Sequence, residues 1–187
     1  YLNTFFSSNL AYPCDAITIN PWLGIDSIKV FTENLRYNKG VFILVHTSNP
    51  GSADLQKKVL MNGNKVYEEL VKMLKPIIRQ HKGKSGLSSI GIVTGATNKK
   101  ETQKLRKQLT ECPFLIPGFG AQGGTLESAR AGLISDTKHK NIFNKGIINS
   151  SRSLCFPKEA GKTSTIKDWK KIVQINLLKT NLDLKSC

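Results

Sequence analysis

The sequence is poor in cysteine and contains no long apolar run. Its 4 cysteines lie far apart in 187 residues and form no Cys-x-x-Cys pair, which excludes a zinc knuckle or a redox motif and favours reduced thiols. The longest apolar run, residues 41–45, has the length of a buried strand and is too short to cross a bilayer. The first residues lack the basic and apolar regions of a signal peptide. We therefore expect a cytoplasmic protein without membrane association.

Acidic residues and aromatic residues are also scarce. Asp and Glu number 13 against 28 Lys and Arg, which gives a formal net charge of +15. Such an excess can attract nucleic acid. However, aromatic residues make up only 7% of the chain and do not alternate with the lysines as they do on a base-stacking platform. We interpret most lysines as solvated helix faces and expect no nucleic-acid partner, with a basic nucleic-acid binder kept as an alternative.

Five apolar segments rich in Val and Ile alternate with segments of helical periodicity, in what we expect to be a single domain over residues 1–187. Strands are predicted at residues 15–20, 41–46, 89–94, 113–117 and 146–149, and their nearly continuous hydrophobicity predicts burial on both faces. Helices are predicted at residues 26–37, 66–77, 102–109, 125–133 and 166–178, with loops at 83–88 and 151–165. The alternation predicts an α/β fold with a parallel sheet, either a small open sheet or part of a (β/α)8 barrel.

Polar loops follow several of these strands, where ligands bind in parallel α/β proteins. Residues 117–124 contain four glycines, so several backbone N–H groups can converge on an anion, and Gly123–Gly124 are expected to open a helix. Arg152 follows the last strand among serines and suits bidentate capture of a phosphate. The Thr47-Ser48-Asn49 cluster can contact the polar edge of a heterocycle, although Ser48 can equally be a helix N-cap. We predict a phosphate site at these loops.

Residue types for acid–base or metal chemistry are not grouped in the sequence. His46, His81 and His139 are scattered, and only His46 lies at the end of a predicted strand. The Asp and Glu residues fall mostly on predicted helices, so no carboxylate pair stands out. We expect neither a metal nor a cofactor.

The same segments, in the same order, resemble the orotidine 5'-phosphate decarboxylase family. Residues 15–24 resemble its fourth-strand segment and residues 47–52 its pyrimidine-contact loop. Residues 93–97 resemble the end of its sixth strand, 117–124 the glycine-rich segment that is the most diagnostic match, and 149–153 its eighth strand and phosphate arginine. The resemblance covers nearly the whole chain. It implies a TIM (β/α)8 barrel, here incomplete, with about the first three strand–helix units lacking.

The resemblance implies the decarboxylation of orotidine 5'-phosphate to UMP in pyrimidine biosynthesis, without a cofactor, by a homodimer acting on a small-molecule substrate. It implies that Ser48 contacts the pyrimidine and that Gln122 and Arg152 hold the 5'-phosphate under a closing glycine-rich segment. The substrate-binding residues implied are Asn20, Thr47, Ser48, Pro117, Gly120, Gln122, Ser151 and Arg152.

One motif of the family has no counterpart in these residues. The Asp-x-Lys-x-x-Asp sequence that supplies the family's charged catalytic network does not occur in the chain. We expect it upstream of Tyr1, so that this segment supplies phosphate and pyrimidine binding but no catalytic residue and is inactive alone. A non-catalytic nucleotide-binding relative and another phosphate-sugar barrel enzyme stay open as alternatives. An unclosed barrel is also expected to leave two sheet edges and apolar surface uncovered.

Overall fold

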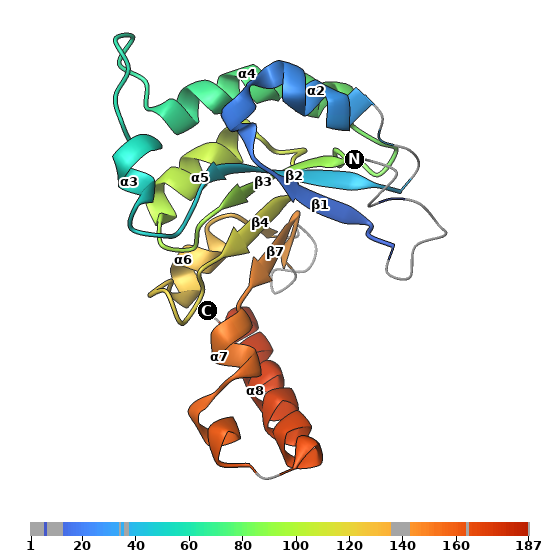
Figure 1. Ribbon diagram of the computed structural model, residues 1–187, viewed down its shortest axis with the longest axis vertical. Helices are drawn as coiled ribbons and strands as arrows, with labels where there is room; N and C mark the ends of the chain where they lie inside the picture. The colour runs from blue at the N-terminus through green and yellow to red at the C-terminus, as the bar shows by residue number, and fades with distance from the viewer. Residues whose placement is uncertain are drawn as a thin grey trace.

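A parallel sheet forms the centre of the protein. The computed structural model describes residues 6, 13–33, 35, 38–135, 143–163 and 165–186. Its main sheet has the strand order β1 (Ala16–Ile19), β2 (Gly40–His46), β3 (Ile90–Thr94), β4 (Phe114–Pro117) and β7 (Gly146–Asn149), and all neighbours are parallel (Figure 1). All five predicted strands are confirmed, with ends that agree to one residue. The strands keep their chain order, as successive units of a barrel do.

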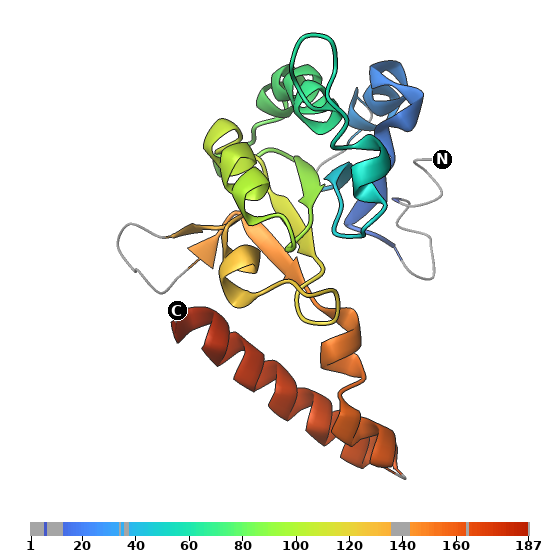
Figure 2. The ribbon, with the colours of Figure 1, turned by 90° about the vertical axis from the view of Figure 1, so that its left-hand side faces the viewer.

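Three helices lie on one face of this sheet, as Figures 1 and 2 show: α2 (Ile25–Glu33), α4 (Val66–Gln80) and α5 (Lys99–Gln108). The remaining elements are η1 (Pro21–Leu23), α3 (Ser52–Leu55), α6 (Leu126–Arg130), the antiparallel pair β5 (Ile134–Ser135) and β6 (Phe143–Asn144), α7 (Ser151–Cys155), η2 (Lys158–Lys162) and α8 (Ile166–Ser186). The predicted helices are therefore present, with altered ends. Positions 34, 36 and 37 of the first one lie outside the described residues.

The prediction of a loop at residues 151–165 is wrong, because this segment contains α7 and η2. Contacts from α8 explain the difference. Trp169 donates its indole N–H to the Cys155 carbonyl at 3.0 Å, and Asn176 donates to the Ser153 carbonyl at 2.6 Å. Both acceptors are α7 carbonyls, and helix ends need such partners. Local sequence patterns do not contain this tertiary information.

The core lies between the sheet and these helices. Ile43, Ile92 and Phe114 occupy one row across three strands and are fully buried. Leu74 and Ile78 of α4 belong to the same buried cluster. Each such side chain contributes about 1.5–3 kcal/mol through removal of its apolar surface from water, so this layer fixes the strands whose ends carry the polar loops.

The other face of the sheet is less well covered. Phe42, Leu44 and Leu115 are half-buried there, and Ile147 on the edge strand β7 is 57% exposed. Only β3 is buried along its whole length, so the prediction of burial on both faces is wrong for the other four strands. The described helices that flank the sheet lie on its opposite side (Figure 2), whereas this face would line the interior of a closed barrel.

Helix α8 extends away from the sheet and contacts α6, α7 and η2 (Figures 1 and 2). Its predicted apolar stripe is half-buried at Trp169, Ile172 and Val173 but exposed at Ile166 and Ile175. Neither α8 nor any other helix in the described part of the chain combines the length and apolar content required to cross a membrane.

Arg106 ties together the amino ends of β4 and β7. Its side chain is only 6% exposed, and its guanidinium donates to the carbonyls of Gly132, Leu109, Cys112 and Lys145 at 2.7–2.9 Å. The same group lies 3.5 Å from the centre of the Phe114 ring. Burial lowers the pKa of Arg106 to about 10, which leaves it charged at neutral pH. One buried cation therefore satisfies four carbonyl groups from three chain segments.

His46 lies beneath the carboxyl end of β2. It is fully buried and stacks on Tyr67 of α4, with ring centres 4.6 Å apart and an angle of 16°. Neither ring nitrogen has a hydrogen-bond partner among the described residues. Burial, followed by the charge of Lys57, lowers the pKa of His46 to about 4. His81 instead lies within hydrogen-bonding distance of carbonyls of α4 and α2, and His139 lies outside the described residues.

Replacing Arg106 with methionine is expected to lower the free energy of unfolding by about 3 kcal/mol, because four carbonyl groups lose a charged donor. Urea denaturation measures this change. The exposed neighbour Lys107 provides the control, and Lys107→Met is expected to change stability by no more than about 0.5 kcal/mol. Equal midpoints for the two variants would contradict the role assigned to Arg106.

Acid is expected to destabilise the fold through His46. Its folded pKa of about 4 lies below the unfolded value of 6.5, so the unfolded state binds the proton more readily. The stability associated with neutral His46 is complete above pH 6.5 and is lost as the pH falls towards 4, by roughly 2–3 kcal/mol. Denaturation at several pH values should give a shallower dependence for His46→Phe than for the wild type. Identical slopes would contradict this expectation.

Candidate functional site

Four loops meet at the carboxyl edge of the sheet. They follow β2, β3, β4 and β7, which are successive neighbours and all run in the same direction. This edge is where parallel α/β folds bind ligands, because the loops there vary without disturbing the core. A cavity of about 1100 Å³ opens at the opposite edge, beside Ala16, Gly40 and Gly91. None of the four loops that follow these strands lines it.

Ser48 and Gln122 are in direct contact across this edge. The Ser48 hydroxyl donates to Gln122 Oε1 at 2.5 Å, although the two residues are 74 positions apart. The N–H groups of the Gln122 amide have no partner within the described ranges. The structure therefore brings together two residues that were predicted to bind different parts of one ligand.

Glycines allow this close approach. A Cβ atom on Gly95 would lie 2.6 Å from Ser48 N and Cα, and one on Gly118 would lie 2.6 Å from Ser48 Cβ. A Cβ atom on Gly124 would lie 2.5 Å from the Gly118 carbonyl oxygen. Gly118 also has a φ of 95°, in the region that glycine adopts at no steric cost. The backbone after β3 and β4 thus approaches the half-buried Ser48 closely, and a side chain at Gly95 or Gly118 would collide with it.

The glycine-rich segment after β4 forms a tight turn. Gly120 N–H donates to the Gly124 carbonyl, Gly123 N–H to Gly120, and Gly124 N–H to Gly118, at 2.8–3.1 Å. These three N–H groups are used within the turn and do not converge outward on one point. The prediction that Gly123–Gly124 open a helix is wrong, because α6 begins at Leu126 after the N-cap Thr125. The Thr125 side chain caps Ser128 N–H, a role that glycine cannot perform.

The segment after β7 is fastened to this turn. Ser150 donates its hydroxyl to the Phe119 carbonyl at 2.9 Å, and its oxygen lies 2.6 Å from the Ser153 hydroxyl. A Cβ atom on Gly120 would lie 2.6 Å from Ser153 Oγ. Arg152 is exposed in α7, and within the described residues its side chain forms neither an ion pair nor a hydrogen bond to Gln122. The two segments therefore adjoin, while the Arg152 guanidinium is available to solvent.

The other predicted contact residues have partners inside the protein. Asn20 caps η1 by accepting from Trp22 N–H at 3.0 Å. The Pro117 carbonyl accepts from Ala96 N–H at 2.8 Å. Ser151 donates its hydroxyl to Asn149 Oδ1 at 3.1 Å, and Thr47 uses its N–H, carbonyl and hydroxyl groups within the protein. Their predicted contacts with a ligand stay predictions.

Two residues at this edge were not predicted from the sequence. Gln56 and Asn98 both hydrogen-bond Thr47, the residue before Ser48. Gln56 follows the short helix α3, and Asn98 precedes α5. Neither position has a local pattern that separates it from an ordinary polar surface residue, so only the three-dimensional structure identifies them.

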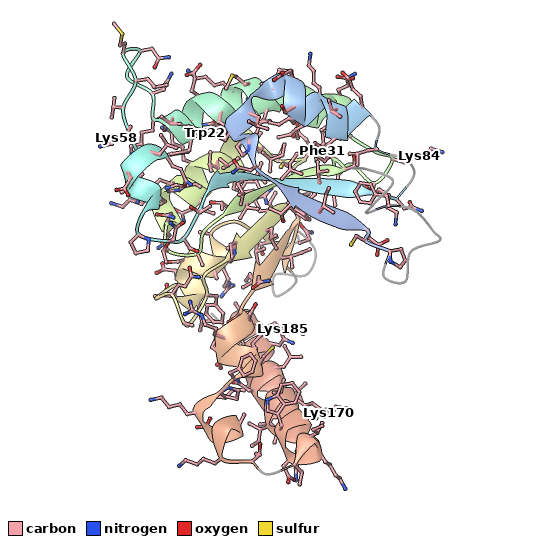
Figure 3. The ribbon with its side chains drawn as sticks, in the orientation of Figure 1. Trp22, Phe31, Lys58, Lys84, Lys170 and Lys185 are labelled. Carbon is pink, nitrogen blue, oxygen red and sulfur yellow. The ribbon has the colours of Figure 1, made fainter. Side chains whose placement is uncertain are left out.

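The charges of the described residues do not suggest a metal centre. No group of three or more His, Cys, Asp or Glu side chains in these ranges is arranged as metal ligands would be. The labelled lysines in Figure 3, Lys58, Lys84, Lys170 and Lys185, lie at widely separated places on the surface. The excess positive charge is therefore not confined to the carboxyl edge.

Comparison with known proteins gives consistent matches. The orotidine 5'-phosphate decarboxylase / HUMPS family matches residues 3–163. An orotidine 5'-phosphate decarboxylase of Clostridium perfringens is 42% identical over 154 residues, covering 82% of this chain and 51% of the relative. One from Haloarcula marismortui is 40% identical over 149 residues, covering 80% of this chain and 48% of the relative. The chain thus spans about half the length of these curated relatives.

The fold comparison agrees with the sequence comparison. A solved structure of Leishmania donovani OMP decarboxylase superposes with a TM-score of 0.64 and 27% identity, covering 93% of this chain and 58% of that chain. This likeness confirms the expected fold, and the five-stranded sheet is part of a TIM barrel. On these matches, the chain belongs to the orotidine 5'-phosphate decarboxylase / HUMPS family.

Proposed function

We propose that the full-length protein is an orotidine 5'-phosphate decarboxylase, a lyase that converts orotidine 5'-phosphate to UMP in pyrimidine biosynthesis without a cofactor. The observation that carries this proposal is the Ser48–Gln122 hydrogen bond. It joins the loop that resembles the pyrimidine-contact loop to the segment that resembles the phosphate loop. A nucleotide with its base near Ser48 and its phosphate beyond Gln122 would span these two loops.

Each residue has a chemical role in this proposal. The Ser48 hydroxyl contacts the polar edge of the pyrimidine, and the Gln122 amide donates towards the phosphate end. Arg152 supplies the charge-assisted hydrogen bonds that a phosphate dianion favours. Asn20, Thr47, Pro117, Gly120 and Ser151 complete the proposed set at the edges of the site. Gly118, Gly120 and Gly123 have positive φ values, which glycine adopts at no steric cost in a turn that lies beside the proposed ligand.

The chemistry requires a charged network in addition to these binding loops. We infer that an Asp-x-Lys-x-x-Asp motif outside the 187 residues supplies it, because the resemblance implies that motif and the present residues lack it. Its lysine would stabilise the carbanion formed by loss of carbon dioxide, in a site from which water is excluded. The binding loops would position the substrate beside that network.

We also infer a cytoplasmic homodimer formed around this edge. Trp22, which follows β1 and is labelled in Figure 3, is 69% exposed, and Leu55 is 43% exposed. The connection between α3 and α4 exposes Val59 and Met61. Apolar side chains that gather beside a site support an interface with a second copy.

The full-length protein is expected to consume orotidine 5'-phosphate. The decrease in the substrate's ultraviolet absorbance measures this reaction. Product formation without added metal or cofactor would support the proposal. Binding of UMP with no turnover would favour the alternative, a non-catalytic nucleotide-binding relative. Preferential binding of a sugar phosphate lacking a base would instead indicate another phosphate-sugar barrel enzyme.

Arg152→Ala is expected to weaken UMP binding by roughly 2–3 kcal/mol, a factor of about 100, because a charge-assisted phosphate contact is lost. Binding of uridine, which has no phosphate, should be unaffected. Isothermal titration with both ligands measures the difference. Lys158→Ala removes a nearby exposed cation and serves as the control. An Arg152→Ala protein with wild-type affinity for UMP would show that the phosphate assignment is wrong.

A further inference from the structure

Gln56 grips Thr47 with both ends of its side-chain amide. Thr47 N–H donates to Gln56 Oε1 at 2.9 Å, and Gln56 Nε2 donates to Thr47 Oγ1 at 2.9 Å. The Thr47 hydroxyl donates in turn to Asn49 Oδ1 at 2.6 Å. These contacts fix the residue immediately before Ser48, and all of them are made by protein groups.

The backbone of Gln56 is itself held on two sides. Its N–H donates to the Ser52 carbonyl at 2.9 Å, which closes α3, and its carbonyl accepts from Tyr67 N–H at 3.1 Å. Tyr67 is 2% exposed in α4 and stacks on His46 of β2. The amide of Gln56 therefore extends from a backbone anchored to the core, and its geometry is set by packing as well as by its own hydrogen bonds.

The loop after β3 holds the two peptides that follow. Asn98, which is 7% exposed, donates from Nδ2 to the Thr47 carbonyl at 3.1 Å. Thr97 donates its hydroxyl to the Ser48 carbonyl at 3.3 Å. Gln56 thus fixes the His46–Thr47 peptide and the Thr47 side chain, and Asn98 fixes the next peptide, between Thr47 and Ser48. The Ser48 hydroxyl is directed at Gln122.

We infer that Gln56 is a positioning residue for pyrimidine recognition, an inference that rests on the proposed function. It holds the backbone N–H and the side chain of Thr47, the residue before Ser48, so that the Ser48 hydroxyl faces the base and Gln122. Without these two hydrogen bonds, Thr47 can shift and the Ser48 hydroxyl loses its direction. The phosphate end of the site depends on β4 and β7, so Gln56 acts on the base and not on the phosphate.

Gln56→Met keeps the length of the side chain and removes its polar groups. In the full-length protein, titration is expected to give an affinity for UMP about 10-fold weaker than wild type, with the affinity for ribose 5-phosphate changed by no more than about 2-fold. Gln56→Glu keeps an acceptor for Thr47 N–H and for the Thr47 hydroxyl. It is expected to restore UMP binding to within about 3-fold of wild type.

The exposed residue Gln103 on α5 provides the matched control, and Gln103→Met should bind both ligands as the wild type does. An unchanged UMP affinity in Gln56→Met would overturn the inference, and so would an equal loss for both ligands, which indicates general damage to the fold. A wild-type protein that binds ribose 5-phosphate but not UMP would overturn the proposed function, and with it any pyrimidine role of Gln56. The two failures are distinguishable, because a failure of the proposed function is already seen in the wild-type protein, whereas a failure of the Gln56 inference is seen only in the variant.

Amide hydrogen exchange tests the hydrogen bonds between Gln56 and Thr47 without any ligand. Thr47 N–H is expected to exchange about 10-fold faster in Gln56→Met than in wild type or in Gln103→Met, because it loses its acceptor. The buried amides of β3 should exchange at unchanged rates. Unchanged protection of Thr47 in Gln56→Met would overturn the inference directly.

Discussion

Ser48 lies against the backbone of two neighbouring strand ends, at positions where the chain has only glycine. The Gly95 and Gly118 positions leave no room for a Cβ atom beside it, and Gly124 leaves none beside Gly118. This steric constraint brings the loops after β2, β3 and β4 within hydrogen-bonding distance of one another. The Ser48–Gln122 contact, the turn at residues 118–124 and the fastening of Ser150 to Phe119 all depend on that closeness. The geometry of this site therefore depends on the glycines, which have no Cβ atom, as much as on its polar groups.

The two edges of the sheet are stabilised by different means. At the amino edge, Arg106 satisfies four carbonyl groups with one buried guanidinium and joins the ends of β4 and β7. At the carboxyl edge, neutral hydroxyl and amide groups form the contacts, and Arg152 is exposed. Folding stability can therefore be concentrated away from the candidate site. The loops at the other edge carry polar groups, and their hydrogen bonds within the protein can be replaced by hydrogen bonds to a ligand.

Much of the fold could be predicted from the sequence, because the strands are short apolar runs and the main helices have clear periodicity. Residues 41–46 and 146–149 illustrate this, since their patterns alone locate β2 and β7 closely. The errors arise where distant residues decide the local structure. α7 depends on Trp169 and Asn176 of α8, and the exposed inner face depends on which layers are packed against the sheet.

The candidate site likewise contains residues that could be predicted from the sequence and residues that could not. Ser48, Gln122 and Arg152 could be named from motifs, because strand-end loops rich in glycine and serine carry a recognisable pattern. Gln56 and Asn98 could not, since their hydrogen bonds to Thr47 form only in the folded chain. The residues proposed to contact the ligand are thus easier to predict than the residues proposed to orient them. The orienting residues nevertheless limit selectivity, because a serine hydroxyl can discriminate between bases only while its peptide is held in one orientation.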